Sequence, residues 1–222
     1  MTNKIKVIIT GASGMVGEGV MNECLFNENI EEVLVIGRRH CGTKHPKLKE
    51  ILHQDFSDIS EINKLLIGYD ACFYCLGITS LNISEQDYFN ITYNLTLHFA
   101  ETLHRSNPLM TFCYVSGAGT DGHEKGKLMW MRIKGKTEND LLKLGFKAAY
   151  MFRPAMIEPG KGLKNTQKLY KYTSWTLPLL KRLFPKYFIT LNEIGQAMIN
   201  SVIYGFDKKV LEVADIKMLS GK

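Results

Sequence analysis

Apolar residues in this chain occur in two kinds of segment that follow each other in turn. One kind is a short continuous run rich in β-branched residues, such as Ile5–Ile9, which has the length of a buried strand. The other is longer and carries apolar residues at helical spacing, as in Val16, Val20, Met21 and Leu25. The pattern predicts strands at residues 5–9, 33–37, 50–53, 70–76, 110–115, 147–152 and 210–213, and further helices at residues 59–66, 84–106, 127–144 and 192–204.

This alternation predicts an α/β fold, with a mainly parallel sheet and helices on both of its faces. Right-handed crossovers favour a doubly wound Rossmann sheet of strand order 3-2-1-4-5-6. Two helix ends carry clear signals: Ser84 as an N-cap with Asp87 three residues on, and Gly145 as a C-terminal cap. The pattern loosens after Pro154. We expect one domain over residues 1–222, in which residues 155–222 form a small C-terminal lobe packed on the sheet.

Composition and charge narrow the class of protein. The 222 residues are 45% hydrophobic and 23% charged, which is typical of a globular domain. Of the net charge of +6, residues 159–192 contribute seven basic and no acidic side chains, so the basic character is local and predicts no nucleic-acid partner. Residues 168–184 could lie on an anionic membrane, but we favour a role in covering the sheet end and a substrate pocket. No leader and no membrane-spanning run is visible, so a cytoplasmic protein is expected.

Cysteine and histidine residues give no sign of a metal or disulfide framework. Cys72 and Cys75 form a C-x-x-C, but residues three apart on a strand point to opposite faces, so the two sulfurs are predicted not to cooperate. Five cysteines are an odd number, which favours reduced, buried thiols. The histidines at positions 40, 45 and 53 lack metal-ligand spacing, and no metal site is expected.

The segment Thr10–Gly17 connects the first strand to the first helix and contains glycine at positions 11, 14 and 17. A glycine-rich turn lets the backbone approach a phosphate closely, and a helix start offers free N–H groups and a positive dipole end. The segment therefore predicts a binding site for a dinucleotide pyrophosphate.

Residues 5–160 resemble the short-chain dehydrogenase/reductase superfamily. The glycine turn resembles its T-G-x-x-G-x-x-G motif, and several further elements follow in the family's order. These are Gln54–Asp58, Cys75–Gly77, Tyr88–Asn90, Tyr114–Ala118 and the Arg153–Gly160 segment. The short C-terminal lobe is most similar to the atypical branch that includes the Tat-interacting-protein-like oxidoreductases.

The resemblance implies a set of cofactor-binding residues. Arg38 and Arg39 stand where an NAD-preferring protein would carry an acidic residue, and a guanidinium there can hold the 2′-phosphate of NADP. NADP is therefore expected rather than NAD. Asp55 could contact adenine or cap a turn. The implied cofactor residues are Gly11, Ser13, Gly14, Met15, Val16, Gly17, Arg38, Arg39, Asp55, Phe56, Leu76, Gly77, Asn90, Lys134 and Pro154.

The implied catalytic pattern is incomplete. Ser116 matches the family's serine and Lys134 its lysine, but the position four before the lysine, where the family has its proton-donating tyrosine, is Trp130. An indole N–H does not ionise usefully and cannot act as a general acid. Ser116 could also cap a turn, and Lys134 could be a solvated helix lysine. Other candidate proton donors are Tyr114, Asp121 and His123.

Two functions follow from this pattern. The first is an NADP(H)-dependent oxidoreductase acting on a small carbonyl or hydroxyl substrate, since the short C-terminal lobe leaves little chain to enclose a nucleotide sugar. The second is a catalytically weak or inactive NADP-binding regulator that acts through partners.

Overall fold

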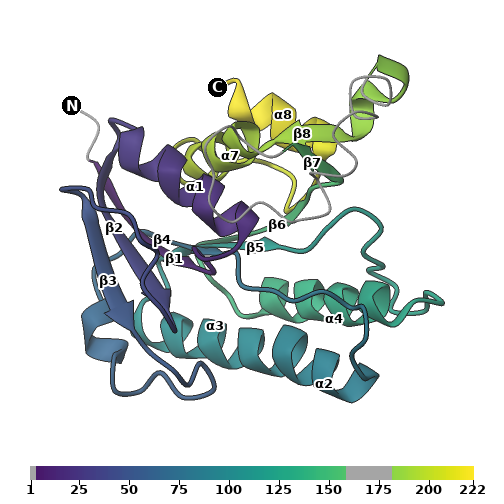
Figure 1. The fold of residues 1–222 in the computed structure, drawn as a ribbon, viewed down its shortest axis with the longest axis horizontal. Helices are drawn as coiled ribbons and strands as arrows, with labels where there is room; N and C mark the ends of the chain where they lie inside the picture. Colours follow the sequence, from purple (N-terminus) through teal and green to yellow (C-terminus); the bar gives the residue numbers. More distant parts are fainter. Residues whose placement is uncertain (1–3, 159–181) are drawn as a thin grey trace.

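The computed structural model describes residues 4–158 and 182–222, which form three layers (Figure 1). A seven-stranded sheet lies in the middle, and all of its neighbouring strands are parallel. The predicted order 3-2-1-4-5-6 is confirmed, and one further strand extends it. In spatial order the strands are β3 (Leu48–Leu52), β2 (Ile30–Gly37), β1 (Ile5–Thr10), β4 (Ala71–Tyr74), β5 (Thr111–Val115), β6 (Ala148–Arg153) and β9 (Val210–Glu212).

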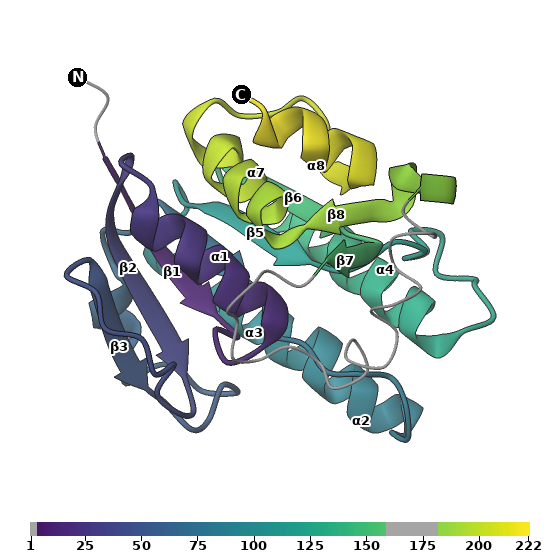
Figure 2. The same ribbon diagram turned by 45° about the horizontal axis from the view of Figure 1, so that its top comes forward.

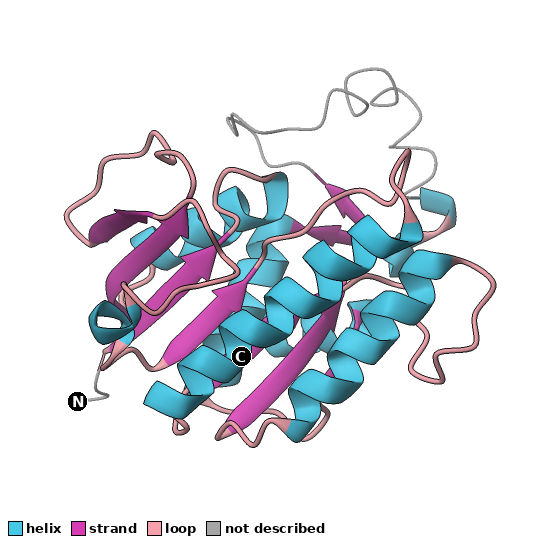
Figure 3. Cartoon of the chain, turned by 90° about the horizontal axis from the view of Figure 1, so that it is seen from below, coloured by secondary structure: helices cyan, strands magenta, loops and turns pink. Residues whose placement is uncertain are grey.

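Helices cover both faces of the sheet. One face carries α1 (Met15–Phe26), α7 (Leu191–Ile203) and α8 (Val213–Ser220), which lie above the sheet in Figure 1. The other carries α2 (Glu85–Phe89), α3 (Leu95–Ser106) and α4 (Met129–Lys143), and Figure 3 shows this face from below. The helices of each layer contact one another, as α1 does α7 and α3 does α4.

Alternate residues of the central strands supply two hydrophobic cores. Val7 and Ile9 of β1 belong to the core under α1 and α7, whereas Ile8 belongs to the core that includes Phe99 of α3. A strand buried on both sides reads as a continuous apolar run, which is why the pattern of residues 5–9 was informative. The same alternation separates the two cysteines of the C-x-x-C motif. Cys72 lies in the second core and Cys75 packs against the first, so the prediction that their sulfurs do not cooperate is confirmed.

The expected single helix over residues 84–106 is interrupted. Ser84 caps its start as predicted, with its hydroxyl accepting from Asp87 N–H, but residues Asn90–Asn94 form a π-helical turn between α2 and α3. A π turn accommodates one extra residue. Tyr88, Thr92 and Thr96, each four residues apart, are all buried.

Other differences lie at the ends of elements. The expected helix at 59–66 is reduced to a 3-10 turn, Asn63–Leu66, and the third strand begins two residues earlier and ends one residue earlier than predicted. The last strand ends at Glu212, because its side chain accepts from Asp215 N–H and so begins helix α8, which the pattern did not predict. Gly145, with φ of +85°, follows α4 in the left-handed conformation expected of a C-terminal cap.

The segment after Pro154 adds a second, two-stranded parallel sheet of β7 (Met156–Glu158) and β8 (Phe188–Thr190). Figure 2 shows β8 beside α7 and α8, and both helices contact it. Leu211 and Ile216 lie in the same core as Val7, so the C-terminal segment shares the sheet's hydrophobic interior. Most of the 168–184 segment, for which we favour a role in covering the sheet end over membrane contact, lies outside the described residues. Within the part of the chain that the structure describes, no helix has the length and apolar content to cross a membrane.

If β9 and α8 belong to one cooperative unit with the sheet, truncating a buried side chain there must destabilise the whole fold. Leu211 is fully buried, so Leu211→Ala is expected to lower the free energy of unfolding by about 2–5 kcal/mol. Met218 on α8 is 66% exposed, and Met218→Ala is expected to change the free energy of unfolding by about 0.5 kcal/mol or less. Denaturant unfolding followed by circular dichroism measures both. Two separate transitions, or no loss for Leu211→Ala, would show that the C-terminal segment unfolds on its own.

Candidate cofactor and active site

The glycine turn is held by close backbone contacts at the carboxyl end of β1. Gly11 has φ of +73°, and a Cβ atom there would lie 2.6 Å from the carbonyl oxygen of Cys75, just after β4. A Cβ atom on Gly17 would lie 2.2 Å from the carbonyl oxygen of Gly11. Gly14 is the N-cap of α1, and its N–H donates to Gly11 at 2.9 Å. Only glycine permits this approach, which directs the unpaired N–H groups at the start of α1 toward the sheet end.

A cavity of about 170 Å³ opens beside this turn. Four separate stretches of the chain form its wall: the turn itself, the end of β2, the residues after β3 and the residues after β4. Eight of the predicted cofactor residues line it, namely Gly11, Ser13, Gly14, Arg38, Arg39, Phe56, Leu76 and Gly77. The sequence analysis missed Ala12, Val35, Ile36, Gly37, Cys41 and Cys75. Most of these adjoin the carboxyl ends of strands or the glycine turn, and that position could have identified them.

The other predicted cofactor residues lie outside the cavity wall. Met15 is buried in the core, Val16 packs against it, and Gly17 contacts Gly11. Asp55 caps a turn, since its Oδ1 accepts from Ser57 N–H at 2.8 Å and from the Ser57 hydroxyl at 2.5 Å. These bonds lower the pKa of Asp55.

Two further predicted residues are also engaged elsewhere. Asn90 is exposed and accepts from the side-chain amides of Gln86 and Asn94. It lines a different cavity, on the outer side of α3. The carbonyl oxygen of Pro154 accepts from Ala118 N–H at 2.9 Å.

The wall of the cavity fits the phosphate groups of a dinucleotide. It offers backbone N–H groups at the start of α1 and the exposed guanidinium groups of Arg38 and Arg39. Among the described residues that line it, none is acidic. Hydrogen-bond donors and positive charge without a competing carboxylate are the chemistry that a phosphate requires.

Ser116, one of the two predicted catalytic residues, lies at the end of β5. Its hydroxyl is already hydrogen-bonded within the protein. Its Oγ lies 2.5 Å from Glu138 Oε1, to which it donates, and 3.2 Å from the carbonyl oxygen of Phe152. The residue is 5% exposed. Its backbone carbonyl oxygen accepts from Lys134 Nζ, so the structure brings the predicted serine and lysine together. In this arrangement the Ser116 proton points to Glu138 and not to a substrate carbonyl.

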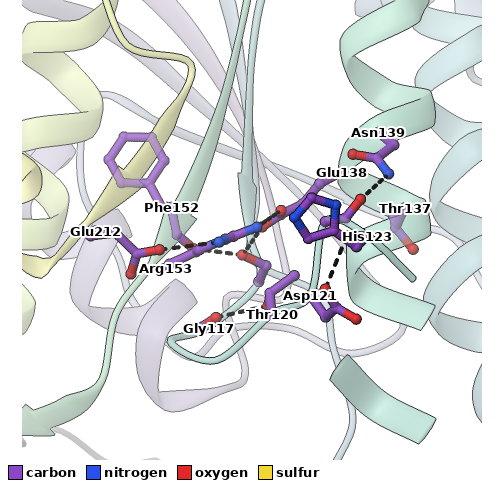
Figure 4. Close-up of polar contacts among 12 residues, drawn as sticks. Gly117, Thr120, Asp121, His123, Thr137, Glu138, Asn139, Phe152, Arg153 and Glu212 are labelled. Carbon is purple, nitrogen blue, oxygen red and sulfur yellow. Dashed lines mark hydrogen bonds and ion pairs between the residues drawn. The ribbon is translucent and has the colours of Figure 1, made fainter. Parts of the chain in front are cut away.

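Glu138 is the centre of a buried ion-pair network (Figure 4). Arg153 of β6 contacts both of its oxygens, with Nη2–Oε2 at 2.5 Å and Nε–Oε1 at 3.0 Å. The same guanidinium contacts Glu212 of β9 at 3.1 Å. The network therefore ties α4 to two strands of the sheet. The sequence analysis missed Glu138, although an acidic residue between Ile133 and Leu141 on the buried side of a helix is a detectable signal.

Trp130 and Lys134 lie on the same face of α4, four residues apart. The Trp130 ring packs on the loop after β5, where a Cβ atom at Gly119 would lie 3.3 Å from its Cη2. Burial lowers the pKa of Lys134 to about 8, an effect that the nearby charge of Glu138 partly opposes. Lys134 is therefore not a solvated surface lysine.

Two of the three alternative proton donors, Tyr114 and Asp121, are held in positions that do not suit proton donation. Tyr114 is 2% exposed within the core under α3 and α4, and burial raises its pKa well above the ordinary value. Asp121 accepts from the N–H groups of His123, Lys125 and Gly126 at 2.6–2.9 Å, which lowers its pKa and keeps it an acceptor. The proposals for Tyr114 and Asp121 are therefore not supported by the geometry, whereas His123 is exposed on its loop (Figure 4).

Comparison with known proteins places this geometry in a family. The model of the NAD dependent epimerase/dehydratase family matches residues 7–135, which is more than half of the chain. The chain belongs to this family. Within it, individual relatives support the resemblance to atypical short-chain dehydrogenases/reductases, and solved structures share the fold.

Two curated relatives and one solved structure illustrate the similarity. Protein HTATIP2 of Rattus norvegicus is 27% identical over 71% of this chain, and the matched part spans 64% of the rat protein, slightly under two thirds of its length. Protein FMP52, mitochondrial, of Candida albicans is 26% identical over 80% of this chain and 81% of its own. The Bordetella bronchiseptica enzyme WbmF, solved in complex with NAD⁺, has a TM-score of 0.69 at 15% identity, covering 98% of this chain and 77% of that one. This structure shows the shared fold.

In this member of the epimerase/dehydratase family, the two carboxylates on Arg153 differ in burial. Glu138 is 1% exposed at its side chain and Glu212 is 52% exposed. Removing one charge of a buried pair leaves the other uncompensated, so Glu138→Gln is expected to destabilise the fold by about 3–5 kcal/mol. Glu212→Gln keeps an acceptor for the α8 cap and is expected to cost about 1 kcal/mol or less. Thermal and denaturant unfolding measure both variants, and equal losses would contradict the assignment of Glu138 as the centre of the network.

Proposed function

We propose that the protein is an NADP(H)-dependent oxidoreductase that acts on a small carbonyl or hydroxyl compound. The observation that carries the proposal is the pair Arg38 and Arg39 at the end of β2, in a cavity wall whose described residues include no acidic side chain. When bound there, the cofactor would supply the hydride chemistry.

The charge at the end of β2 distinguishes the two nicotinamide cofactors. An acidic side chain at this place accepts hydrogen bonds from the free ribose hydroxyls of NAD, whereas a guanidinium can hold a 2′-phosphate with two parallel bonds. Charged hydrogen bonds of about 1.5–3 kcal/mol each would favour NADP over NAD roughly 10- to 100-fold. Both arginines are exposed, and their guanidinium groups are therefore accessible to a ligand.

The family and its neighbours support nicotinamide-cofactor binding in general. The epimerase/dehydratase model is described as NAD dependent, and the WbmF structure contains NAD⁺. The glycine turn in this chain fits the phosphates that NAD and NADP share. The choice between the two therefore rests on Arg38 and Arg39.

Two observations favour a second candidate, an NADP-binding protein without turnover. The residue at the usual tyrosine position is Trp130, and the Ser116 hydroxyl donates to Glu138. Incubation with NADPH and a panel of aldehydes, ketones and α-diketones separates the candidates. Oxidation of NADPH that depends on the carbonyl compound supports the oxidoreductase, and its absence in a protein that binds NADPH supports the second candidate.

Charge reversal at the end of β2 tests the choice of cofactor. Arg38→Glu and Arg39→Glu are each expected to weaken NADPH binding roughly 10- to 100-fold, since one charged contact to the 2′-phosphate is lost. NADH binding is expected to be unchanged or improved. Isothermal titration calorimetry with both cofactors makes the measurement.

Arg105→Glu is a matched control, since Arg105 is an exposed arginine at the far end of α3. It should leave both affinities unchanged. Equal affinity for NADPH and NADH in the unmodified protein, or no effect of either reversal, would count against an NADP site.

A further inference from the structure

The described residues around the end of β5 include few groups that can exchange a proton with a substrate. Trp130 does not ionise, and the Ser116 hydroxyl donates to Glu138. Tyr114 is enclosed in the core, and Asp121 is held as an acceptor by three backbone N–H groups. Of the remaining ionisable groups, His123 is exposed further along the loop, whereas the ammonium of Lys134 contacts the Ser116 carbonyl oxygen directly at the end of β5.

The side chain of Lys134 is directed to the end of β5 by a specific contact. Its Nζ donates to the carbonyl oxygen of Ser116, which uses one of the three N–H bonds of an ammonium. Two donors therefore remain. Lys134 is also one helical turn from Trp130, so the two side chains project from the same face of α4.

The charged groups around Lys134 come from α4 and β6. Glu138, one turn further along α4, is the charged group that acts on it, and Arg153 of β6 is occupied by Glu138 and Glu212. From β5 it meets the uncharged Ser116 carbonyl. Burial is the larger influence and lowers the pKa of Lys134 to about 8, whereas Glu138 raises it. A lysine of ordinary pKa, 10.5, would hold its proton too firmly for efficient transfer near neutral pH.

We propose that Lys134 is the group that gives a proton to the substrate oxygen, in place of the tyrosine that this chain lacks. The inference rests on the proposed NADP(H)-dependent oxidoreductase function. When bound, NADPH would supply the hydride to the carbonyl carbon, and the π electron pair of the C=O bond would move to oxygen. That oxygen takes a proton from Lys134 Nζ, which becomes a neutral amine and is then reprotonated by water. The carbonyl compound is reduced to an alcohol and NADPH is oxidised to NADP⁺.

The assignment fixes the sign of the pH dependence. Reduction requires protonated Lys134, so kcat/KM for carbonyl reduction is expected to fall as pH rises through the pKa of about 8. Oxidation of the alcohol requires the neutral amine, so its kcat/KM is expected to rise over the same range. Opposite pH limbs in the two directions are a signature that a purely structural lysine would not produce.

The test compares Lys134→Arg with Lys136→Arg in the full-length protein. Arginine at 134 keeps a positive charge and hydrogen-bond donors but does not release its proton in this pH range. Lys136 is two residues along the same helix, where it pairs with Asp140 at 2.9 Å, and Lys136→Arg serves as the control. NADPH affinity is measured by calorimetry, and NADPH oxidation with the carbonyl panel is measured across pH for each protein. Lys134→Met provides a second, uncharged variant.

The expected result is a loss of roughly 100-fold or more in kcat for Lys134→Arg and Lys134→Met, and loss of the alkaline limb. NADPH affinity is expected to change less than a few-fold for Lys134→Arg, and Lys136→Arg should behave like the unmodified protein. A Lys134→Arg enzyme that retains its rate and its alkaline limb would overturn the inference alone. Absence of NADPH oxidation with the whole panel, in a protein that binds NADPH, would overturn both the inference and the oxidoreductase function. Failure to bind NADPH would overturn the cofactor assignment itself.

Discussion

The contact of the glycine turn with the end of β4 is the constraint on which the rest of the cofactor side depends. Because Gly11 lies against the Cys75 carbonyl and Gly17 against Gly11, helix α1 begins close to the carboxyl ends of β1 and β4. The same contact holds the ends of β1 and β4 close together, and the cavity opens beside them. Helix α1, once placed, forms the surface on which α7 packs. A side chain at position 11 or 17 would therefore disturb both the phosphate site and the C-terminal half of the layer.

The part of the molecule around Ser116 and Lys134 depends on a different interaction, the burial of the Glu138 carboxylate. Taking a carboxylate out of water costs several kcal/mol, and here two bonds from Arg153 and one from Ser116 offset that cost. Arg153 belongs to β6 and Ser116 follows the end of β5. Their bonds to Glu138 therefore determine where α4 lies against the sheet. The serine hydroxyl is occupied as a consequence. The family pattern predicts that Ser116 contacts the substrate. In this chain its hydroxyl instead bonds Glu138 and helps to hold α4 in place.

Local patterns in the sequence were sufficient for the parts of the structure that local contacts determine. The buried strands are continuous apolar runs, and the glycine turn and the two arginines directly follow β1 and β2 in the sequence. The π turn at Asn90–Asn94, the pairing of β7 with β8 and the addition of β9 depend on packing between distant segments. The Ser116–Glu138 bond spans 22 positions and needs Arg153 from another strand. A glutamate on an amphipathic helix gives no local sign of such a pairing unless its place among the apolar positions is noticed.

The replacement of tyrosine by Trp130 changes the chemistry of the site without requiring a change of scaffold. Position 130 lies in the first turn of α4, and the buried contacts that anchor this helix involve Ile133, Glu138 and Leu141 further along it. The ring can therefore change while the helix stays in place, with its lysine still bonded to the Ser116 carbonyl. Glu138 then acts in two ways on this face: it accepts a hydrogen bond from the Ser116 hydroxyl, and its charge opposes the lowering of the Lys134 pKa by burial. Without that charge the pKa of Lys134 would be lower still, because desolvation alone favours the neutral form. One buried carboxylate thus removes the serine from the reaction and maintains the lysine as a group that can exchange a proton.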